Sequence, residues 1–149
     1  MNQEKIEREL DEIGRLHESP IEYQFGCALV FALANSTIRI RAQYQVEHYR
    51  YDFTLIHPIL EKALMFIECD GEEFHSSAEQ LANDRAKERL AETIGAFVVR
   101  YSGSAIYRNS KDCAESAVRS LVRGWDWCIA ASNRDGVQNG KISRANVVD

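Results

Sequence analysis

The spacing of apolar residues predicts two helices in the first 34 positions. Over residues 2–17, apolar side chains recur every three or four positions among charged ones, which is typical of an amphipathic helix lying on a domain. Ser19, Pro20 and Glu22 then form a capping-box signature, in which Ser19 is the cap and Glu22 reaches back toward it. We therefore expect a second helix over residues 20–34.

The period of the pattern changes to two after residue 36, which predicts β-strands over residues 37–46, 49–55 and 63–70. The third strand is apolar on both faces until its last residues, as is typical of a strand at the centre of a sheet. In the second strand, alternation predicts two faces, one with Tyr49, Tyr51, Phe53 and Leu55 and the other with Arg50, Asp52 and Thr54.

The second half of the chain alternates between helical and extended patterns. A helix is expected over residues 77–94, ending at Gly95, with an apolar stripe of Ala82, Ala86, Leu90 and Ile94. Residues 97–101 then predict a strand that returns after this helix as a βαβ crossover. A last helix is expected over residues 110–131, with a kink or break at Gly124. The polar tail lacks periodicity, and we expect it to be loose unless a partner orders it.

The order of these elements is helix, three strands, helix, strand (αβββαβ). It predicts an α/β (α+β) fold with a central four-stranded mixed sheet flanked by helices. At 149 residues, the chain is long enough for one compact domain with a proper core. We divide it into an N-terminal amphipathic helix (residues 1–18), a main domain (residues 19–131) and a polar tail (residues 132–149).

Composition and charge argue against several classes of protein. No apolar run is long enough to cross a bilayer and the N-terminal residues are too charged for a secretory signal, so we expect a cytoplasmic protein. The four cysteines lack Cys-x-x-Cys spacing, which argues against a zinc knuckle or a disulfide framework. The net charge of −5 argues against coating nucleic acid by electrostatics alone, but not against an enzyme whose acidic residues surround metal ions.

The stretch MFIECDGEEFH, residues 65–75, carries the main candidate chemistry. An apolar strand ends here in Glu68 and Asp70, which are two residues apart and therefore point to the same face, and Gly71 allows a sharp turn. Two negative charges at the end of a core strand are costly unless a positive charge neutralises them. Together with Asp52 on the preceding strand, these carboxylates predict a site for a divalent metal ion.

The combined pattern resembles the PD-(D/E)XK nuclease superfamily, in a restriction-endonuclease-like group close to the very-short-patch mismatch repair endonucleases. The resemblance covers residues 19–107. The motifs that carry it are Tyr49-Arg50-Tyr51-Asp52-Phe53, then Ile67-Glu68-Cys69-Asp70-Gly71, and then His75, Gln80, Asp84, Lys87, Gly95 and Arg100. The resemblance implies a restriction-endonuclease-like core.

The resemblance also implies the activity of a Mg²⁺-dependent DNA endonuclease, with Mn²⁺ as a substitute, serving DNA repair, restriction or mobile-element defence. Asp52 is then the bridging metal ligand and Glu68 its partner from the neighbouring strand, since strands lie about 5 Å apart. The resemblance to these nucleases also implies that the protein forms a homodimer or part of a larger nuclease complex. The region around Trp125 and Trp127, with the tail, is the candidate surface for such assembly.

Two positions depart from the superfamily pattern. Tyr51 replaces the usual proline before Asp52, and Asp70 stands where the superfamily usually has the lysine that orients or deprotonates the attacking water. Asp70 would instead hold a second metal ion, or Lys87 or His75 would supply the missing function. Gln80, Asp84 and Lys87 are spaced to form one polar stripe on the following helix.

Each candidate also has a structural interpretation. The capping box explains Glu22 as well as a catalytic role does, and Gln80, Asp84 and Lys87 also fit a solvated helix face. Arg100 is either a tether for a carboxylate or phosphate or a surface arginine. For the whole protein, the alternative is a catalytically inactive nuclease-fold module that binds nucleic acid or a protein partner. A zinc site built from His48, His57, His75 and Cys69 is disfavoured because these residues lack ligand spacing.

Overall fold

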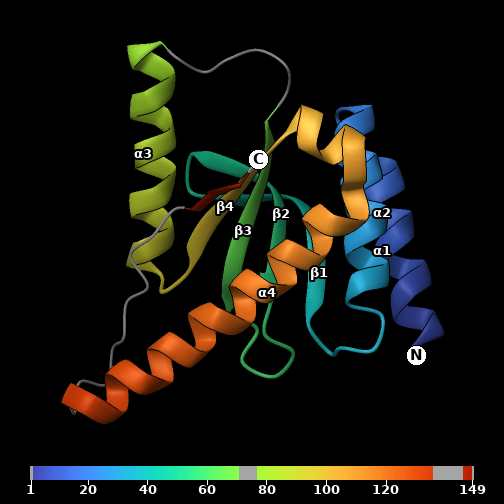
Figure 1. The fold of residues 1–149 in the computed structure, drawn as a ribbon. Coiled ribbons are helices and arrows are strands. Elements are labelled where there is room, and N and C mark those ends of the chain that lie inside the picture. The colour runs from blue at the N-terminus through green and yellow to red at the C-terminus, as the bar shows by residue number, and fades with distance from the viewer. Residues whose placement is uncertain (1, 71–76, 136–145, 149) are drawn as a thin grey trace.

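The computed structural model describes residues 2–70, 77–135 and 146–148, with side chains as far as Gly124. Four helices and five strands follow one another along these residues (Figure 1). The helices are α1 (Gln3–Leu16), α2 (Pro20–Ala32), α3 (Ala78–Thr93) and α4 (Gly103–Asp135). The strands are β1 (Arg39–Val46), β2 (Tyr49–Ile56), β3 (Ala63–Asp70), β4 (Phe97–Ser102) and β5 (Asn146–Val148).

The strands form one mixed sheet in the order β1-β2-β3-β4-β5. The first three strands are antiparallel, whereas β4 pairs parallel to β3 and β5 pairs parallel to β4. β3 lies in the middle of the sheet, as its continuous apolar run predicted. The mixed sheet with flanking helices confirms the predicted fold class, and the tail adds a fifth strand to the four expected ones.

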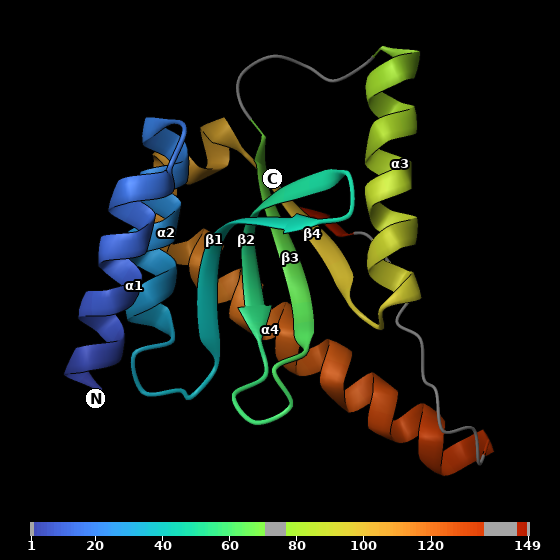
Figure 2. The same ribbon diagram turned by 180° about the vertical axis from the view of Figure 1, so that it is seen from behind.

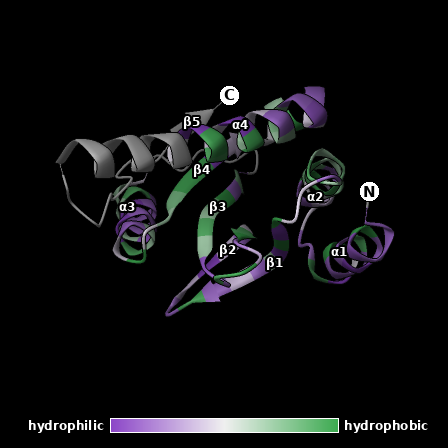
Figure 3. Cartoon of the chain, turned by 90° about the horizontal axis from the view of Figure 1, so that it is seen from below, coloured by the Kyte–Doolittle hydropathy of each residue, from purple (hydrophilic) through white to green (hydrophobic). Residues whose placement is uncertain are grey.

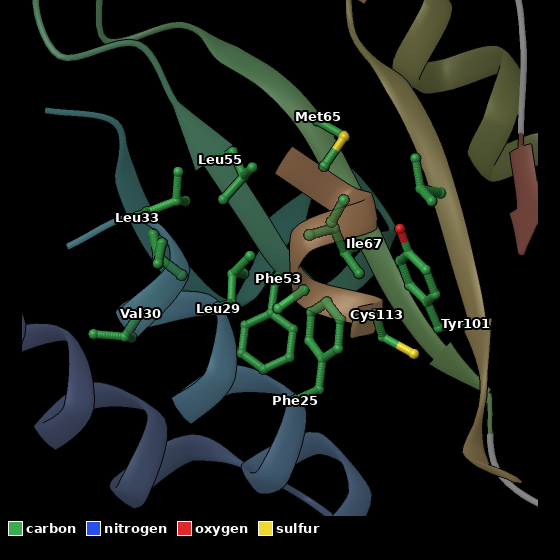
Figure 4. Packing of buried hydrophobic residues seen from close by; sticks show 14 of the residues in the cluster. Phe25, Leu29, Val30, Leu33, Phe53, Leu55, Met65, Ile67, Tyr101 and Cys113 are labelled. Atoms are coloured by element: carbon green, nitrogen blue, oxygen red, sulfur yellow. The ribbon is translucent and has the colours of Figure 1, made fainter. Parts of the chain in front are cut away.

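The helices cover the two faces of the sheet unequally. α1, α2 and α4 pack over the face that carries Phe53, Ile67 and Tyr101, and α3 lies over the opposite face (Figure 3). The larger core therefore lies under α2 and α4 (Figure 4). The smaller cluster, on the α3 side, consists of buried Tyr51, Phe66, Ala91, Ala96 and Val98.

The face predicted for β2 is wrong at Tyr51. Phe53 packs in the larger core, as predicted, but Tyr51 packs on the α3 side, where its ring stacks on Phe66 with 4.0 Å between centroids. The reason is that β2 pairs with β3 only from Phe53 onward, and its first residues pair with β1 alone. The β1–β2 hairpin thus bends away from β3 toward α3 (Figure 2).

The predicted apolar stripe of α3 does not face the sheet. Ala82 and Ile94 are exposed, and among the residues of α3, all of which the structure describes, Ala91 alone is buried. The side of α3 that faces the sheet instead carries the polar residues Lys87 and Glu88. The predicted helix bounds are confirmed, with Ser77 as the N-cap and Gly95 at a φ of 81° after the last turn.

The last helix and the tail also differ from expectation. α4 begins at Gly103, and its kink lies at Asn109 (φ −159°, ψ 84°), while the backbone stays helical through Gly124. α4 continues to Asp135, past the boundary predicted at residue 132, and β5 pairs with β4. In the part of the chain that the structure describes, no helix is long and apolar enough to span a membrane.

Candidate active site

Asp52 and Glu68 meet where β2 parts from β3. The last β2–β3 pair is Phe53 with Ile67, and the next available N–H on β3, that of Cys69, is donated to Oδ2 of Asp52 at 2.7 Å. At the bend of the hairpin, the carboxylate of Asp52 thus accepts the Cys69 N–H, which a main-chain oxygen of β2 would accept if the two strands stayed paired. Glu68, on the neighbouring strand, is 8% exposed, so both carboxylates lie in a largely dry environment.

Glu22 of α2 joins this pair through Gln43. The side-chain amide of Gln43 donates to Oε2 of Glu22 at 2.7 Å and lies 3.5 Å from Oδ1 of Asp52. Gln43 was missed by the sequence analysis, because its one unusual feature, a φ of 48° inside a strand, is not visible in the sequence. The bridge brings a third carboxylate, from a different element, toward the first two.

The structure confirms the capping role of Glu22 and also places its side chain near Asp52, while its catalytic role stays a prediction. Ser19 Oγ accepts from the Glu22 N–H at 3.2 Å, and Glu22 Oε2 in turn accepts from the N–H of Glu18 at 3.1 Å. The capping contact therefore forms, although it reaches Glu18 and not Ser19 itself. The same oxygen also binds Gln43, and Glu22 is only 5% exposed, so this residue belongs to the carboxylate cluster as well as to the cap.

Lys87 reaches the cluster from the opposite side of the sheet. Its Nζ donates to Oε1 of Glu68 at 2.6 Å and to the main-chain oxygen of Arg50 at 3.0 Å. These contacts exclude the solvated-face interpretation for Lys87. They place an ammonium group next to the strand that carries Asp70 in place of the usual lysine.

Burial raises the pKa values of all three carboxylates, and a neighbouring carboxylate adds to this effect for Glu22 and Asp52. Burial, and then the charge of Asp52, raise the pKa of Glu22 to about 7. Burial and the charge of Glu68 raise the pKa of Asp52 to about 7. Burial raises the pKa of Glu68 as well, although Lys87 and Arg100 act in the opposite direction. Lys87 and Arg100 thus offset only part of the effect of burial on Glu68.

The predicted metal-binding triad of Asp52, Glu68 and Asp70 is not assembled. Among the described residues, no three side chains of His, Cys, Asp or Glu are grouped closely enough to hold a metal ion. Asp70 is half-buried at the end of β3, beside Ser102 of β4. Glu68 instead contacts Lys87, whose Nζ lies 2.6 Å from its Oε1, and Asp52 accepts from the N–H of Cys69.

The remaining predicted residues divide into three cases. Gln80 is exposed and its Oε1 lies 3.1 Å from Oγ of the helix cap Ser77, so it stands apart from the carboxylates. Asp84 approaches the buried Arg100, with its Oδ1 3.9 Å from the guanidinium Nη2. His75 lies outside the described residues, so its predicted role stays a prediction.

Arg100 is a buried tether, not a surface arginine. It is 4% exposed, it is the register neighbour of Glu68 on β4, and its Nη2 donates to the main-chain oxygen of Asp84 at 3.2 Å. Its Nη1 pairs with Glu88, one turn farther along α3. Glu88 was missed by the sequence analysis, and its spacing of four from Asp84 was the available signal. Arg100 thereby fixes α3 beside the site.

Comparison with known families gives one match. The sequence model of REase_MTES_1575, a restriction-endonuclease-like family, matches residues 25–121, about two thirds of the chain. The chain belongs to this family. Membership supports the PD-(D/E)XK superfamily and indicates a nuclease. Comparisons with curated proteins and with solved structures give no match.

The residues at the centre of this restriction-endonuclease-like protein fit a hard divalent cation. Mg²⁺ is usually bound through one or two carboxylates and completed by water and substrate phosphate, and Asp52 with Glu68 supplies such a pair. The ionised forms of Glu22 and Asp52 are disfavoured first by burial and then by a neighbouring carboxylate, which leaves an excess of negative charge when both are ionised. A bound cation would relieve this excess.

Proposed function

We propose that this protein is a Mg²⁺-dependent endonuclease that hydrolyses phosphodiester bonds in DNA, with Mn²⁺ as a substitute. The observation that carries the proposal is the contact of Lys87 with Glu68, beside Asp52, in a chain of a restriction-endonuclease-like family. Two carboxylates can hold a Mg²⁺ ion, and an ammonium group beside them can orient the attacking water. The contact restores the lysine that Asp70 displaces.

Asp52 and Glu68 are the residues that would hold the metal ion. When bound, Mg²⁺ would neutralise charge on the phosphoryl oxygens and lower the pKa of water. An ammonium group has three N–H donors, and Lys87 uses two of them on Glu68 and the Arg50 carbonyl. The third is available to orient a water molecule or to bind a phosphate oxygen of the substrate.

The charge of the site makes DNA binding itself depend on the cation. The chain has a net charge of −5, and the proposed metal ligands Asp52 and Glu68 are both acidic, with Glu22 linked to Asp52 through Gln43. Without a cation, like charges would repel the DNA backbone. The kinship to very-short-patch repair endonucleases, a role in repair, restriction or mobile-element defence, and assembly as a homodimer or within a larger complex belong to the same proposal.

The test measures cleavage of supercoiled plasmid, single-stranded DNA and a mismatched duplex with Mg²⁺, with Mn²⁺ and with EDTA. Asp52→Asn and Glu68→Gln keep the size and shape of the side chains while removing the charge and one acceptor oxygen. We expect each to reduce cleavage by at least about 100-fold. The matched control is Asp11→Asn, an exposed carboxylate on α1, which should cleave at the wild-type rate.

Cleavage that survives in both Asp52→Asn and Glu68→Gln would overturn the proposal. A protein that binds DNA in EDTA, shows no Mn²⁺ binding by calorimetry and cleaves none of the substrates would be the inactive nuclease-fold module. The contact of Lys87 with Glu68 argues against that alternative, because an inactive module would have no need to restore the displaced lysine.

A further inference from the structure

Tyr51 holds the main chain of Lys87. Its side chain is fully buried, with its ring stacked on Phe66 at an interplanar angle of 16°. Its hydroxyl group donates to the main-chain oxygen of Lys87 at 2.7 Å. A residue of the β1–β2 hairpin, next to Asp52 in sequence, is thereby joined directly to the helix that carries the ammonium group.

The ring of Tyr51 also limits where the Lys87 ammonium group can lie. Nζ of Lys87 is 5.5 Å from the centroid of this ring, within the range of a cation–π interaction. Nζ also donates to the carbonyl of Arg50, the residue before Tyr51. The hairpin thus contacts Lys87 at two places, the main-chain oxygen and the ammonium group.

Apolar packing contributes little to holding Lys87 in place. A lysine side chain loses about 2 kcal/mol of rotamer entropy when it is held in one conformation. α3 supplies little apolar anchoring, since Ala91 is the one buried residue among all its residues in the described structure. The Tyr51 hydroxyl group binds α3 at the turn that carries Lys87, where the position of the helix determines the reach of Nζ.

We propose that Tyr51 is a positioning residue that holds Lys87 against Glu68, and this inference rests on the proposed nuclease function. Tyr51 does not act as a base. Its hydroxyl group lies 2.7 Å from a carbonyl oxygen, which can only accept, so the group carries its proton and serves as a donor. Its effect on the reaction passes through Lys87, and substrate binding should not depend on it.

The first test is a double-mutant cycle between Tyr51→Phe and Lys87→Ala. Tyr51→Phe keeps the ring and removes the hydroxyl donor. Because one buried hydrogen bond is lost, we expect kcat to fall about fivefold to tenfold with KM unchanged. In the Lys87→Ala background, the same change should alter kcat by less than about twofold. Equal losses in the two backgrounds would overturn the proposal.

The matched control is Tyr101→Phe. Tyr101 is also fully buried, and its hydroxyl group donates to Ser116 at 3.3 Å in the core on the opposite face of the sheet. Both variants remove one hydroxyl group from a buried tyrosine, so thermal unfolding reports a similar structural cost for each. Only Tyr51→Phe should lower kcat. An equal fall in kcat for Tyr101→Phe would show a general effect on folding.

A second measurement separates this inference from the proposed function. The ¹⁵Nζ–H signal of Lys87, assigned with Lys87→Arg, reports how firmly the ammonium group is held, whether or not the protein cleaves DNA. We expect its exchange with water to quicken about threefold or more in Tyr51→Phe and to stay unchanged in Tyr101→Phe. Unchanged exchange in Tyr51→Phe would overturn the positioning role. If both carboxylate variants still cleaved DNA, the proposed nuclease function would be overturned and the positioning role of Tyr51 would not.

Discussion

Nζ of Lys87 lies 2.6 Å from Oε1 of Glu68, although the two residues are 19 positions apart and come from a helix and a central strand. Their side chains are 15% and 11% exposed, so the pair is largely removed from water. Pairs of this kind are sensitive to the loss of either partner, because the remaining charge is left buried. Changes at Lys87 therefore test both the chemistry and the electrostatics of the site.

Lys87→Met removes the ammonium group and keeps much of the apolar stem. We expect kcat for DNA cleavage to fall about 100-fold, as for the loss of a group that positions or transfers a proton. Lys87→Arg should recover only part of this loss, because a planar guanidinium group does not reproduce the donor geometry of an ammonium group. Lys111→Met, at an exposed position on α4, is the control. Full activity in Lys87→Met would remove Lys87 from the mechanism.

Without a bound metal ion, we expect the free energy of unfolding to fall as the pH rises, because of the carboxylate cluster of Glu22, Asp52 and Glu68. The pKa values of Glu22 and Asp52 are raised to about 7 in the folded protein, above ordinary values of 4.5 and 3.8. The folded state therefore holds more protons than the unfolded state between about pH 4 and pH 7. The stability that these protons contribute is complete below this window and is lost as the pH rises through 7.

Asp52→Asn should flatten this pH dependence, since it removes one titrating group and relieves the others. Urea unfolding in EDTA, followed at pH 5 and pH 8, should show the wild-type free energy of unfolding falling by about 2 kcal/mol more than that of the variant. The exposed Asp11→Asn variant should follow the wild type. A wild-type protein that gains stability over this range would contradict the raised pKa values.

Two glycines on neighbouring helices should respond oppositely to alanine. A Cβ at Gly26 would lie 2.8 Å from Cγ2 of Ile13 and 2.9 Å from Cζ of Phe53, both buried, so Gly26→Ala should cost about 2 kcal/mol. A Cβ at Gly14 of α1 would meet nothing within 4 Å, and Gly14→Ala should gain about 1 kcal/mol from helix propensity. Chemical denaturation measures both, and changes of the same sign would refute the packing described for α1 and α2.

The sequence predicted the fold well where the pattern is local. The capping box at Ser19, the apolar run of β3 and the helix stop at Gly95 each depend on neighbours a few positions apart, and all three appear in the structure. β5 was missed because three residues in a polar tail carry no periodicity. Their place is set by the free edge of β4, which lies far away in the sequence.

The candidate site was predicted in part, for a related reason. Asp52 and Glu68 were found because strand order and spacing place them side by side. Asp70 was included because it shares a strand face with Glu68, but alternation gives only the direction of a side chain and not which other side chains gather around it. Gln43 joins the site through a positive φ, which depends on the bend of the whole hairpin and not on its own neighbours in sequence.

Because α3 is sparsely packed, the free energy that keeps the site assembled differs from the free energy of unfolding of the whole protein. Segments with few buried apolar side chains open locally at a lower free energy than the core, so α3 can detach while β3 and the helices behind it stay folded. Such an opening would carry Lys87 away and leave Glu68 in place. Whether Lys87 contacts Glu68 then depends on how firmly α3 packs against the sheet. Variants with a normal free energy of global unfolding can therefore still differ in the fraction of molecules in which this contact is formed.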